Sequence, residues 1–190
     1  MRIKDHGLLL FMLGVSAGVE WISDWIDLLQ YERDAILDGE LWRLVSAHLV
    51  HGTHLHWLLN SLGLILVWAI YPAYFRRPGS LVFVMLLAVC ISAQLLVLSP
   101  EVTWYLGMSA LLHGLFAAWS LLDVLSGRRL AALPLCLVVA KVLYEQYAGA
   151  SPGVVAAIGL PVLVDAHLYG VMAGVVLAVV MYPLAWWRRA

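Results

Sequence analysis

Five polar side chains stand out because they lie inside apolar stretches, where a polar group is costly. They are Ser109, His113, His167, His56 and Asn60. A serine hydroxyl becomes a nucleophile when a base within hydrogen-bond reach takes its proton. We expect His167 to be that base, and later the acid that protonates a leaving amine. These residue types therefore predict acyl-transfer chemistry.

The tetrahedral intermediate of acyl transfer needs hydrogen-bond donors around its oxyanion. We expect them from His56, from Asn60 and from the backbone N–H of Ser109, because the first N–H groups of a helix have no intrahelical partner. No carboxylate is expected to complete a triad. Asp165 lies two residues before His167, and such positions do not share a helix face. The sequence thus predicts a Ser–His dyad.

The composition places this chemistry in a membrane. Of the 190 residues, 64% are apolar and only 12% are charged, and the mean hydropathy is +0.92. These values exclude a soluble domain, a disordered chain and a nucleic-acid-binding protein. Cys90 and Cys136 both lie in apolar runs, which argues against a disulfide framework and a zinc site. No cofactor and no metal ion is expected.

Six stretches are long and apolar enough to cross the hydrocarbon core as helices. The predicted fold class is therefore an all-α membrane protein, a six-helix bundle that forms one domain over residues 1–190. The approximate spans are 7–26, 55–74, 80–98, 106–125, 130–147 and 166–187.

Basic residues near the span ends predict the orientation, because such residues concentrate on the cytoplasmic side. Eight of them fall on one side of a six-span chain: Arg2, Lys4, Arg76, Arg77, Arg128, Arg129, Arg188 and Arg189. Both termini are then cytoplasmic, and Ser109, His167 and His56 lie at a similar shallow depth below the outer surface. The outer loop over about 148–165 is rich in Gly, Pro and Ala, which fits either a lid or a flexible connector.

Small residues predict that the fourth and sixth spans pack closely, because small faces let helix backbones approach. The fourth span carries Gly107, Ala110, Gly114 and Ala117, and the sixth carries His167, Gly170 and Gly174. This packing would bring Ser109 and His167 together.

In this order, these motifs make the sequence similar to the rhomboid intramembrane serine proteases over nearly the whole chain. The matching segments are Trp42-Arg43 (a WR motif), His51 with His56-x-x-x-Asn60 (HxxxxHxxxN), Gly107-Met108-Ser109 (the start of GxSG) and Ala166-His167-x-x-Gly170-x-x-x-Gly174 (AHxxGxxxG). The resemblance implies an outward-open cavity with Ser109 as nucleophile, His167 as base, and His56, Asn60 and the Ser109 N–H as oxyanion donors. Gly107, Trp42, Arg43 and His51 are possible accessory residues.

The sequence departs from the family pattern after the serine, where Ala110 replaces glycine and His113-Gly114 follows. The resulting GMSALLHG resembles the rhombosortase branch, short bacterial rhomboids paired with proteins that carry a C-terminal GlyGly sorting tail. This resemblance implies a bacterial inner-membrane enzyme with its site on the periplasmic side. Its substrates would be membrane-anchored exported proteins cut near such tails.

His113 and the remaining charged groups have more than one interpretation. His113 either orients groups in the pocket or is a buried neutral histidine bonded to a carbonyl of a neighbouring helix. Lys141 and Glu145 are expected to neutralise each other or to reach the interface. Glu20 is expected to reach water or to pair with Arg43.

Three other functions fit parts of the sequence. The first is a general rhomboid protease of transmembrane substrates. The second is a small metal or solute transporter that uses the cluster of His48, His51, His54 and His56. The third is a non-catalytic rhomboid-like binding protein. A transporter is expected to place charged groups or broken helices at the membrane midplane, and an inactive relative is expected to lack the serine or the histidine.

Overall fold

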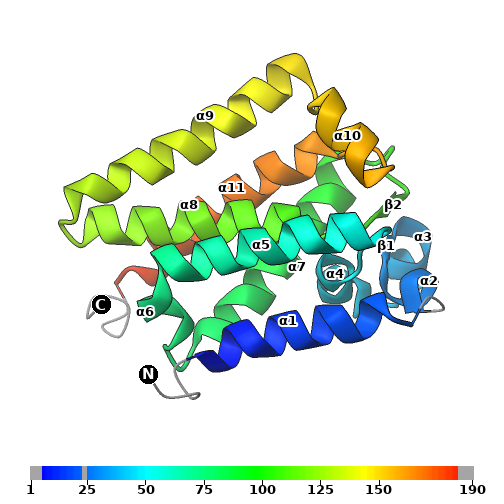
Figure 1. Cartoon of the computed structure of the whole chain (residues 1–190), viewed down its shortest axis with the longest axis horizontal. Coiled ribbons are helices and arrows are strands. Elements are labelled where there is room, and N and C mark those ends of the chain that lie inside the picture. Colours follow the sequence, from blue (N-terminus) through cyan, green and yellow to red (C-terminus); the bar gives the residue numbers. More distant parts are fainter. Residues whose placement is uncertain (1–5, 23–24, 184–190) are drawn as a thin grey trace.

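The computed structural model describes residues 6–22 and 25–183, and nearly all of its regular structure is helical (Figure 1). Six long helices form the bundle: α1 (Gly7–Glu20), α5 (His54–Ile70), α7 (Ser80–Leu98), α8 (Ser109–Leu125), α9 (Ala132–Ala148) and α11 (Val164–Met181). Each overlaps one predicted span. The prediction of an all-α membrane bundle is confirmed.

Fewer segments qualify as membrane crossings than there are long helices. By length and hydropathy, three helical segments qualify as spans: Ser80–Leu98, Arg129–Ala148 and Val164–Met181. The bent pair Arg43–Leu49 and His54–Ile70 adds a fourth. The described helices α1 and α8 have only 14 and 17 residues, so a six-span topology stays a prediction.

Helix ends depart from the predicted spans where the local chain changes direction. The helix α1 ends at Glu20, and the separate helix α2 (Trp25–Leu29) follows, so the predicted span 7–26 is too long. The helix α8 begins three residues after the predicted start at 106, because Gly107 has a φ of +119°. The predicted end of the last span, 184–187, lies outside the described residues.

The helices α8 and α11 pack backbone against backbone, as their small residues predicted. A Cβ built on Gly170 would overlap the carbonyl oxygen of Ala110, and one on Gly174 would overlap that of Gly114. In the other direction, a Cβ on Gly114 would lie 2.7 Å from the carbonyl oxygen of Gly170. No larger side chain fits at these contacts, so the glycines set the separation of the two helices.

An aromatic cluster holds the bundle together at the other end of α8. Trp119 is fully buried and stacks on Tyr74 with ring centroids 5.5 Å apart, and Phe75 meets it edge-on at 4.9 Å. Tyr74 and Phe75 belong to the short helix α6 (Pro72–Phe75), which follows α5. The cluster thereby fixes the end of α5 against α8.

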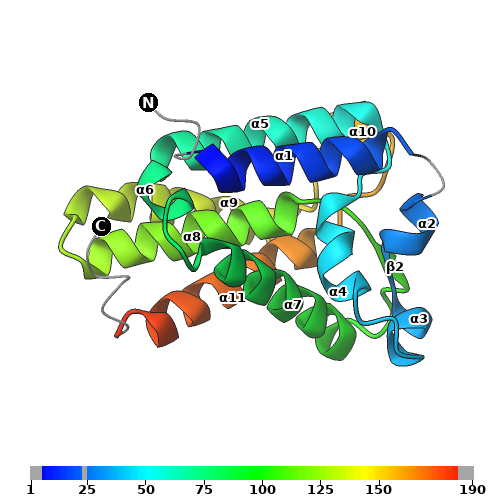
Figure 2. The same cartoon turned by 90° about the horizontal axis from the view of Figure 1, so that it is seen from below.

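The first long loop folds against the segment that leads into α8. It contains α2, β1 (Tyr31–Glu32), α3 (Arg33–Leu37), α4 (Arg43–Ser46) and the 3₁₀ helix η2 (Ala47–Leu49). The strand β1 pairs antiparallel with β2 (Trp104–Tyr105), with Tyr31 opposite Tyr105. Figure 2 shows α2, α3 and α4 gathered beside β2 at one end of the bundle. Three residues separate β2 from Ser109, so this pairing anchors the approach to the serine.

The connection between α9 and α11 is more ordered than either sequence interpretation expected. It forms the helix α10 (Pro152–Ile158), which begins with proline and ends at Gly159 in the left-handed conformation. Proline at the first position and glycine after the last are typical helix boundaries. The Thr53 hydroxyl donates to the Ile158 carbonyl at 3.0 Å, which ties α10 to the start of α5. A second 3₁₀ helix, η3 (Arg129–Ala131), joins α8 to α9.

Candidate active site

Ser109 is the first residue of α8, and the chain reaches it through a conformation that favours glycine. The φ of +119° at Gly107 is one that L side chains rarely adopt. A Cβ at this position would also lie 2.8 Å from Cε1 of His56. Gly107 therefore allows both the turn into α8 and the close approach of the His56 ring.

Ser109 and His167 are in direct contact, as the sequence predicted. Ser109 Oγ lies 2.9 Å from Nε2 of His167, which belongs to the first turns of α11. The side chain of His167 is only 6% exposed. The serine hydroxyl can donate its proton to this nitrogen when the ring carries its own proton on Nδ1.

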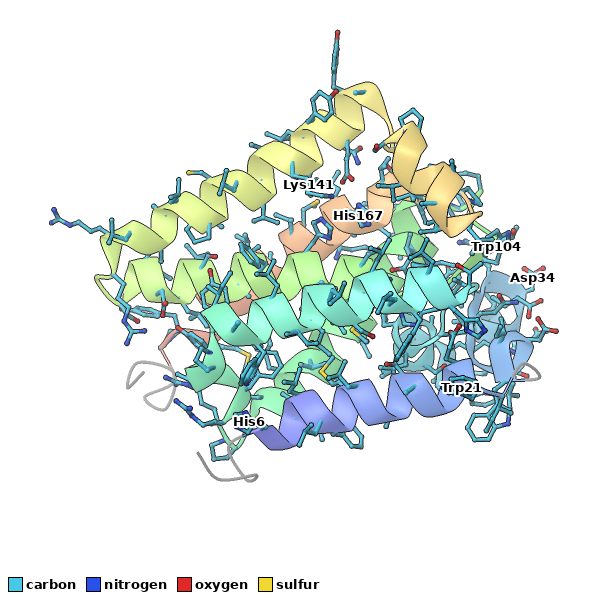
Figure 3. All side chains as sticks on the ribbon, in the orientation of Figure 1. His6, Trp21, Asp34, Trp104, Lys141 and His167 are labelled. Carbon is cyan, nitrogen blue, oxygen red and sulfur yellow. The ribbon has the colours of Figure 1, made fainter. Side chains whose placement is uncertain are left out.

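A carboxylate does reach the histidine, so the prediction that none would do so is wrong. Nδ1 of His167 lies 2.9 Å from Oε2 of Glu145, on α9. Lys141 Nζ donates to Oε1 of the same carboxylate at 2.7 Å. The predicted Lys141–Glu145 pair is present, yet it leaves one carboxylate oxygen for His167. Figure 3 shows Lys141 and His167 close together between α9 and α11.

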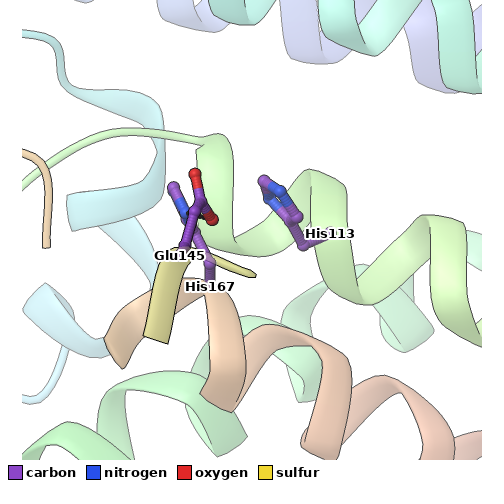
Figure 4. Close-up of side chains that lie close together, drawn as sticks. All are labelled: His113, Glu145 and His167. Carbon is purple, nitrogen blue, oxygen red and sulfur yellow. Dashed lines mark hydrogen bonds and ion pairs between the residues drawn. The ribbon is translucent and has the colours of Figure 1, made fainter. Parts of the chain in front are cut away.

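His113 joins this cluster from α8. Its ring stacks on that of His167, with centroids 4.3 Å apart and planes inclined by 18°. Its Nδ1 lies 2.7 Å from the Ser109 carbonyl oxygen, which can only accept, so Nδ1 donates. His113 is thus bonded to a carbonyl of its own helix while it contacts the predicted base. Figure 4 shows His113, Glu145 and His167 converging from α8, α9 and α11.

The predicted oxyanion donors lie on the other side of Ser109, at the start of α5. The Thr53 hydroxyl accepts from the His56 backbone N–H at 3.2 Å and caps this helix. One turn later, the Asn60 side-chain amide donates to the His56 carbonyl at 3.2 Å. This bond uses one amide N–H, and the amide has a second. The structure thus brings His56 and Asn60 to the same cavity as Ser109.

The predicted accessory residues Trp42, Arg43 and His51 are not among the residues that line the cavity. His51 is buried and meets the His56 ring edge-on at 5.1 Å. Trp42 donates to the Leu28 carbonyl at 3.2 Å. Arg43 is buried and donates to two carbonyls of the first loop and to Glu40.

The four histidines proposed as a transporter cluster bond to different partners. His48 Nε2 lies 3.1 Å from Ser92 Oγ. His54 is exposed and pairs with Glu20 at 2.7 Å, which also corrects the expectation that Glu20 reaches water or pairs with Arg43. The rings of His51 and His56 contact each other edge-on, and within the described part of the chain these four histidines do not bring three ligand atoms together.

One group of described residues does bring three possible ligand atoms within 4.8 Å, namely His113, Glu145 and His167. The lone pair of an imidazole nitrogen lies in the ring plane, so two stacked rings do not aim at one ion. Lys141 also already balances the charge of Glu145. The cluster therefore fits acid–base chemistry better than metal binding.

These side chains open onto a cavity of about 510 Å³. Its polar lining includes Ser109, His167, Glu145, Lys141, His56 and Asn60. Ile158 and Leu160 from the α10 connection also line it. The cavity has room for a short extended peptide beside the serine, and its wall is partly apolar.

Sequence reasoning missed Glu145, although a signal was present. An ionisable residue inside a membrane span is by default a candidate functional residue. The i, i+4 spacing to Lys141 instead favoured the interpretation of Glu145 as one half of a neutral ion pair. The sequence does not show that the face of α9 that carries Glu145 is turned toward α11.

Comparison with known proteins shows which family the chain belongs to. A search of curated proteins found no match. A family model for the Rhomboid domain matches residues 38–184, which include all of the cavity residues named above. This match covers most of the chain, and the multi-pass helical fold is consistent with it. The chain therefore belongs to the rhomboid family of intramembrane serine proteases.

Proposed function

We propose that this protein is an intramembrane serine endopeptidase in which Ser109 is the nucleophile and His167 the general base. The observation that carries the proposal is the 2.9 Å contact between Ser109 Oγ and His167 Nε2 at the wall of a cavity of about 510 Å³. The family match supports the reaction class. The partner would be a membrane-anchored protein whose chain enters this cavity.

The proposed reaction has two halves. Ser109 Oγ attacks the scissile carbonyl while its proton moves to His167 Nε2, and the resulting oxyanion accepts bonds from Asn60, His56 and the Ser109 N–H. The C–N bond then breaks as His167 protonates the leaving amine. Water attacks the acyl-enzyme, gives a proton to His167 and releases the second product, and Ser109 regains its proton.

The proposed setting is the plasma membrane of a bacterium, with the site facing the periplasmic side. Basic pairs such as Arg76-Arg77 and Arg128-Arg129 support this orientation, because six crossings with both termini in the cytoplasm would place them inside. Arg2, Lys4, Arg188 and Arg189 agree in sequence but lie outside the described residues.

The proposed substrates are exported proteins that carry a C-terminal GlyGly tail before their membrane anchor. A cavity near one end of the bundle requires a locally unwound segment, and glycine unwinds a helix most easily. The GMSALLHG motif, similar to the rhombosortase branch, supports the same substrate class. Cleavage at or beside the pair would release the exported domain from its anchor.

A reporter with such a tail tests the proposed specificity. We expect co-expression to release a domain joined to a GlyGly pair, an apolar span and basic residues, while Gly→Val substitution at both positions lowers release at least about tenfold, since β-branched residues restrict the backbone. Ser109→Ala provides the control without enzyme activity. Equal cleavage of both reporters would instead identify a general rhomboid protease.

The oxyanion assignment makes a separate prediction. We expect His56→Ala to lower kcat for a cleaved reporter by about 10²–10³, the usual cost of removing one oxyanion donor, and Asn60→Ala to reduce but not abolish it. His54→Ala is a matched control, because His54 lies on the same helix but is exposed and pairs with Glu20. A wild-type kcat in His56→Ala would contradict the assignment.

A further inference from the structure

We infer that Glu145, held by Lys141, is a positioning residue that turns the Ser109–His167 pair into a Ser–His–Glu relay. The inference rests on the proposed function and goes beyond a dyad. Its basis is the contact between Glu145 Oε2 and His167 Nδ1 at 2.9 Å, across two different helices.

The contact matters because it selects the useful form of the His167 ring. To accept the serine proton, Nε2 must be unprotonated, so the ring proton must sit on Nδ1. An ionised carboxylate is only an acceptor. Placed 2.9 Å from Nδ1, it bonds to a protonated Nδ1 and stabilises that tautomer.

Lys141 holds the Glu145 carboxylate in the orientation in which it contacts His167. It lies one turn before Glu145 on α9 and donates to Oε1 at 2.7 Å, so the two carboxylate oxygens serve different partners. The Glu145 side chain is 14% exposed, whereas that of Lys141 is 50% exposed. The carboxylate therefore faces the interior, and the ammonium group balances it from the more exposed side.

The His113 ring constrains His167 from another direction. The two rings stack at 4.3 Å, and His113 is itself fixed by its bond to the Ser109 carbonyl. With Ser109 on Nε2, Glu145 on Nδ1 and His113 against the ring face, His167 has little freedom to rotate. Three helices thus set one ring orientation.

A carboxylate that is close to His167 in the sequence does not for that reason contact its ring. Asp165 lies on α11 only two residues before His167, yet within the described part of the chain it forms no hydrogen bond or ion pair with the ring. The contact to Glu145 spans 22 residues. It depends on how α9 packs against α11, and it is specific to that face of α9.

The relay moves no proton to the carboxylate. During attack the proton passes from Ser109 Oγ to His167 Nε2, and the ring becomes positively charged while Nδ1 keeps its proton. Glu145 stabilises this charge in place, and the same proton then goes to the leaving amine. We therefore expect Glu145 to stabilise the transition state and to leave substrate binding unchanged.

The test compares Glu145→Gln with the matched variant Asp165→Asn in the full-length protein in micelles. Each removes one carboxylate near His167, but only the first removes a bonded one. Saturation kinetics with a fluorophosphonate probe should show a maximal labelling rate lowered about 100-fold in Glu145→Gln and unchanged in Asp165→Asn. This loss is smaller than the about 10⁴-fold loss in the chymotrypsin-type triad, because Lys141 shares the carboxylate. The half-saturating probe concentration should stay within about twofold in both.

A spectroscopic readout separates positioning from a general structural role. A proton held between Nδ1 and a carboxylate gives a far-downfield NMR signal, which we expect in the wild type, in Ser109→Ala and in Asp165→Asn, and not in His167→Ala or Glu145→Gln. Because the wild type itself must show the signal, the test does not depend on Glu145→Gln folding.

The possible outcomes distinguish failure of the proposed function from failure of the relay. Labelling that persists in Ser109→Ala would overturn the proposed function. If Ser109→Ala abolishes labelling while Glu145→Gln labels at the wild-type rate, or if the wild type lacks the downfield signal, the Ser–His chemistry stands and the relay is wrong.

Discussion

Replacing Ser109 by alanine is expected to abolish reporter cleavage and fluorophosphonate labelling together. Without Oγ no acyl-enzyme forms, and loss of the nucleophile in a serine protease costs about 10⁶ in kcat. His167→Ala should have nearly the same effect, because the two residues act as one unit through their 2.9 Å contact. Gel fluorescence of the labelled protein and release of the reporter domain measure both effects.

The control for this experiment is the serine directly after the end of the same helix. Ser126 follows the end of α8 and is exposed, so Ser126→Ala should label and cleave like the wild type. Both variants should remain folded in the membrane. Labelling at the wild-type level in Ser109→Ala would assign the nucleophile to a different residue and remove the basis of the mechanism.

Replacing Gly170 by alanine is expected to disrupt the fold and the site together. The added Cβ would overlap the Ala110 carbonyl oxygen and lie 3.0 Å from its carbonyl carbon, and both atoms belong to rigid helix backbone. Overpacking at such a contact costs about 3 kcal/mol or more of unfolding free energy. Since Gly170 lies one turn after His167, separation of the helices would also lengthen the Ser109–His167 contact. A misplacement of about 1 Å costs about 10²-fold in rate.

Thermal denaturation in micelles and fluorophosphonate labelling measure these two effects. The matched control is Gly18→Ala in α1, where a new Cβ meets nothing within 4 Å. Alanine is the better helix former, so this variant should be as stable as the wild type or slightly more stable. A Gly170→Ala protein with the wild-type melting temperature would show that the backbone contact is not a constraint.

The sequence predicted the helices better than it predicted their relative rotation. The span 80–98 coincides with α7 because an uninterrupted apolar run defines it. The contact between Ser109 and His167 was predictable because small residues mark the packed faces of α8 and α11. Glu145 was not, because nothing within α9 indicates which neighbour its polar face meets. That choice depends on tertiary packing.

In two places, overall composition led to a prediction that local helix-boundary residues would have corrected. The Gly- and Pro-rich stretch after α9 suggested a loop, although Pro152 and Gly159 are the residues that start and end α10. The apolar run after Met1 suggested a long first span, whereas α1 ends at Glu20. Composition averaged over about 20 residues does not detect such boundaries, and individual capping residues do.

Because Ser109 and His167 lie far apart in the sequence, the site is completed late in synthesis of the chain. Ser109 and His167 are separated by 58 residues, and ribosomes add about 5–20 residues per second. A nascent chain thus holds its serine for about 3–12 s before its histidine has even been synthesised. Because Glu145 also precedes His167, all other parts of the relay wait for α11. The insertion machinery therefore handles a protein that lacks the proposed base, and on the proposed mechanism peptide-bond cleavage becomes possible only after this late helix has docked against α8.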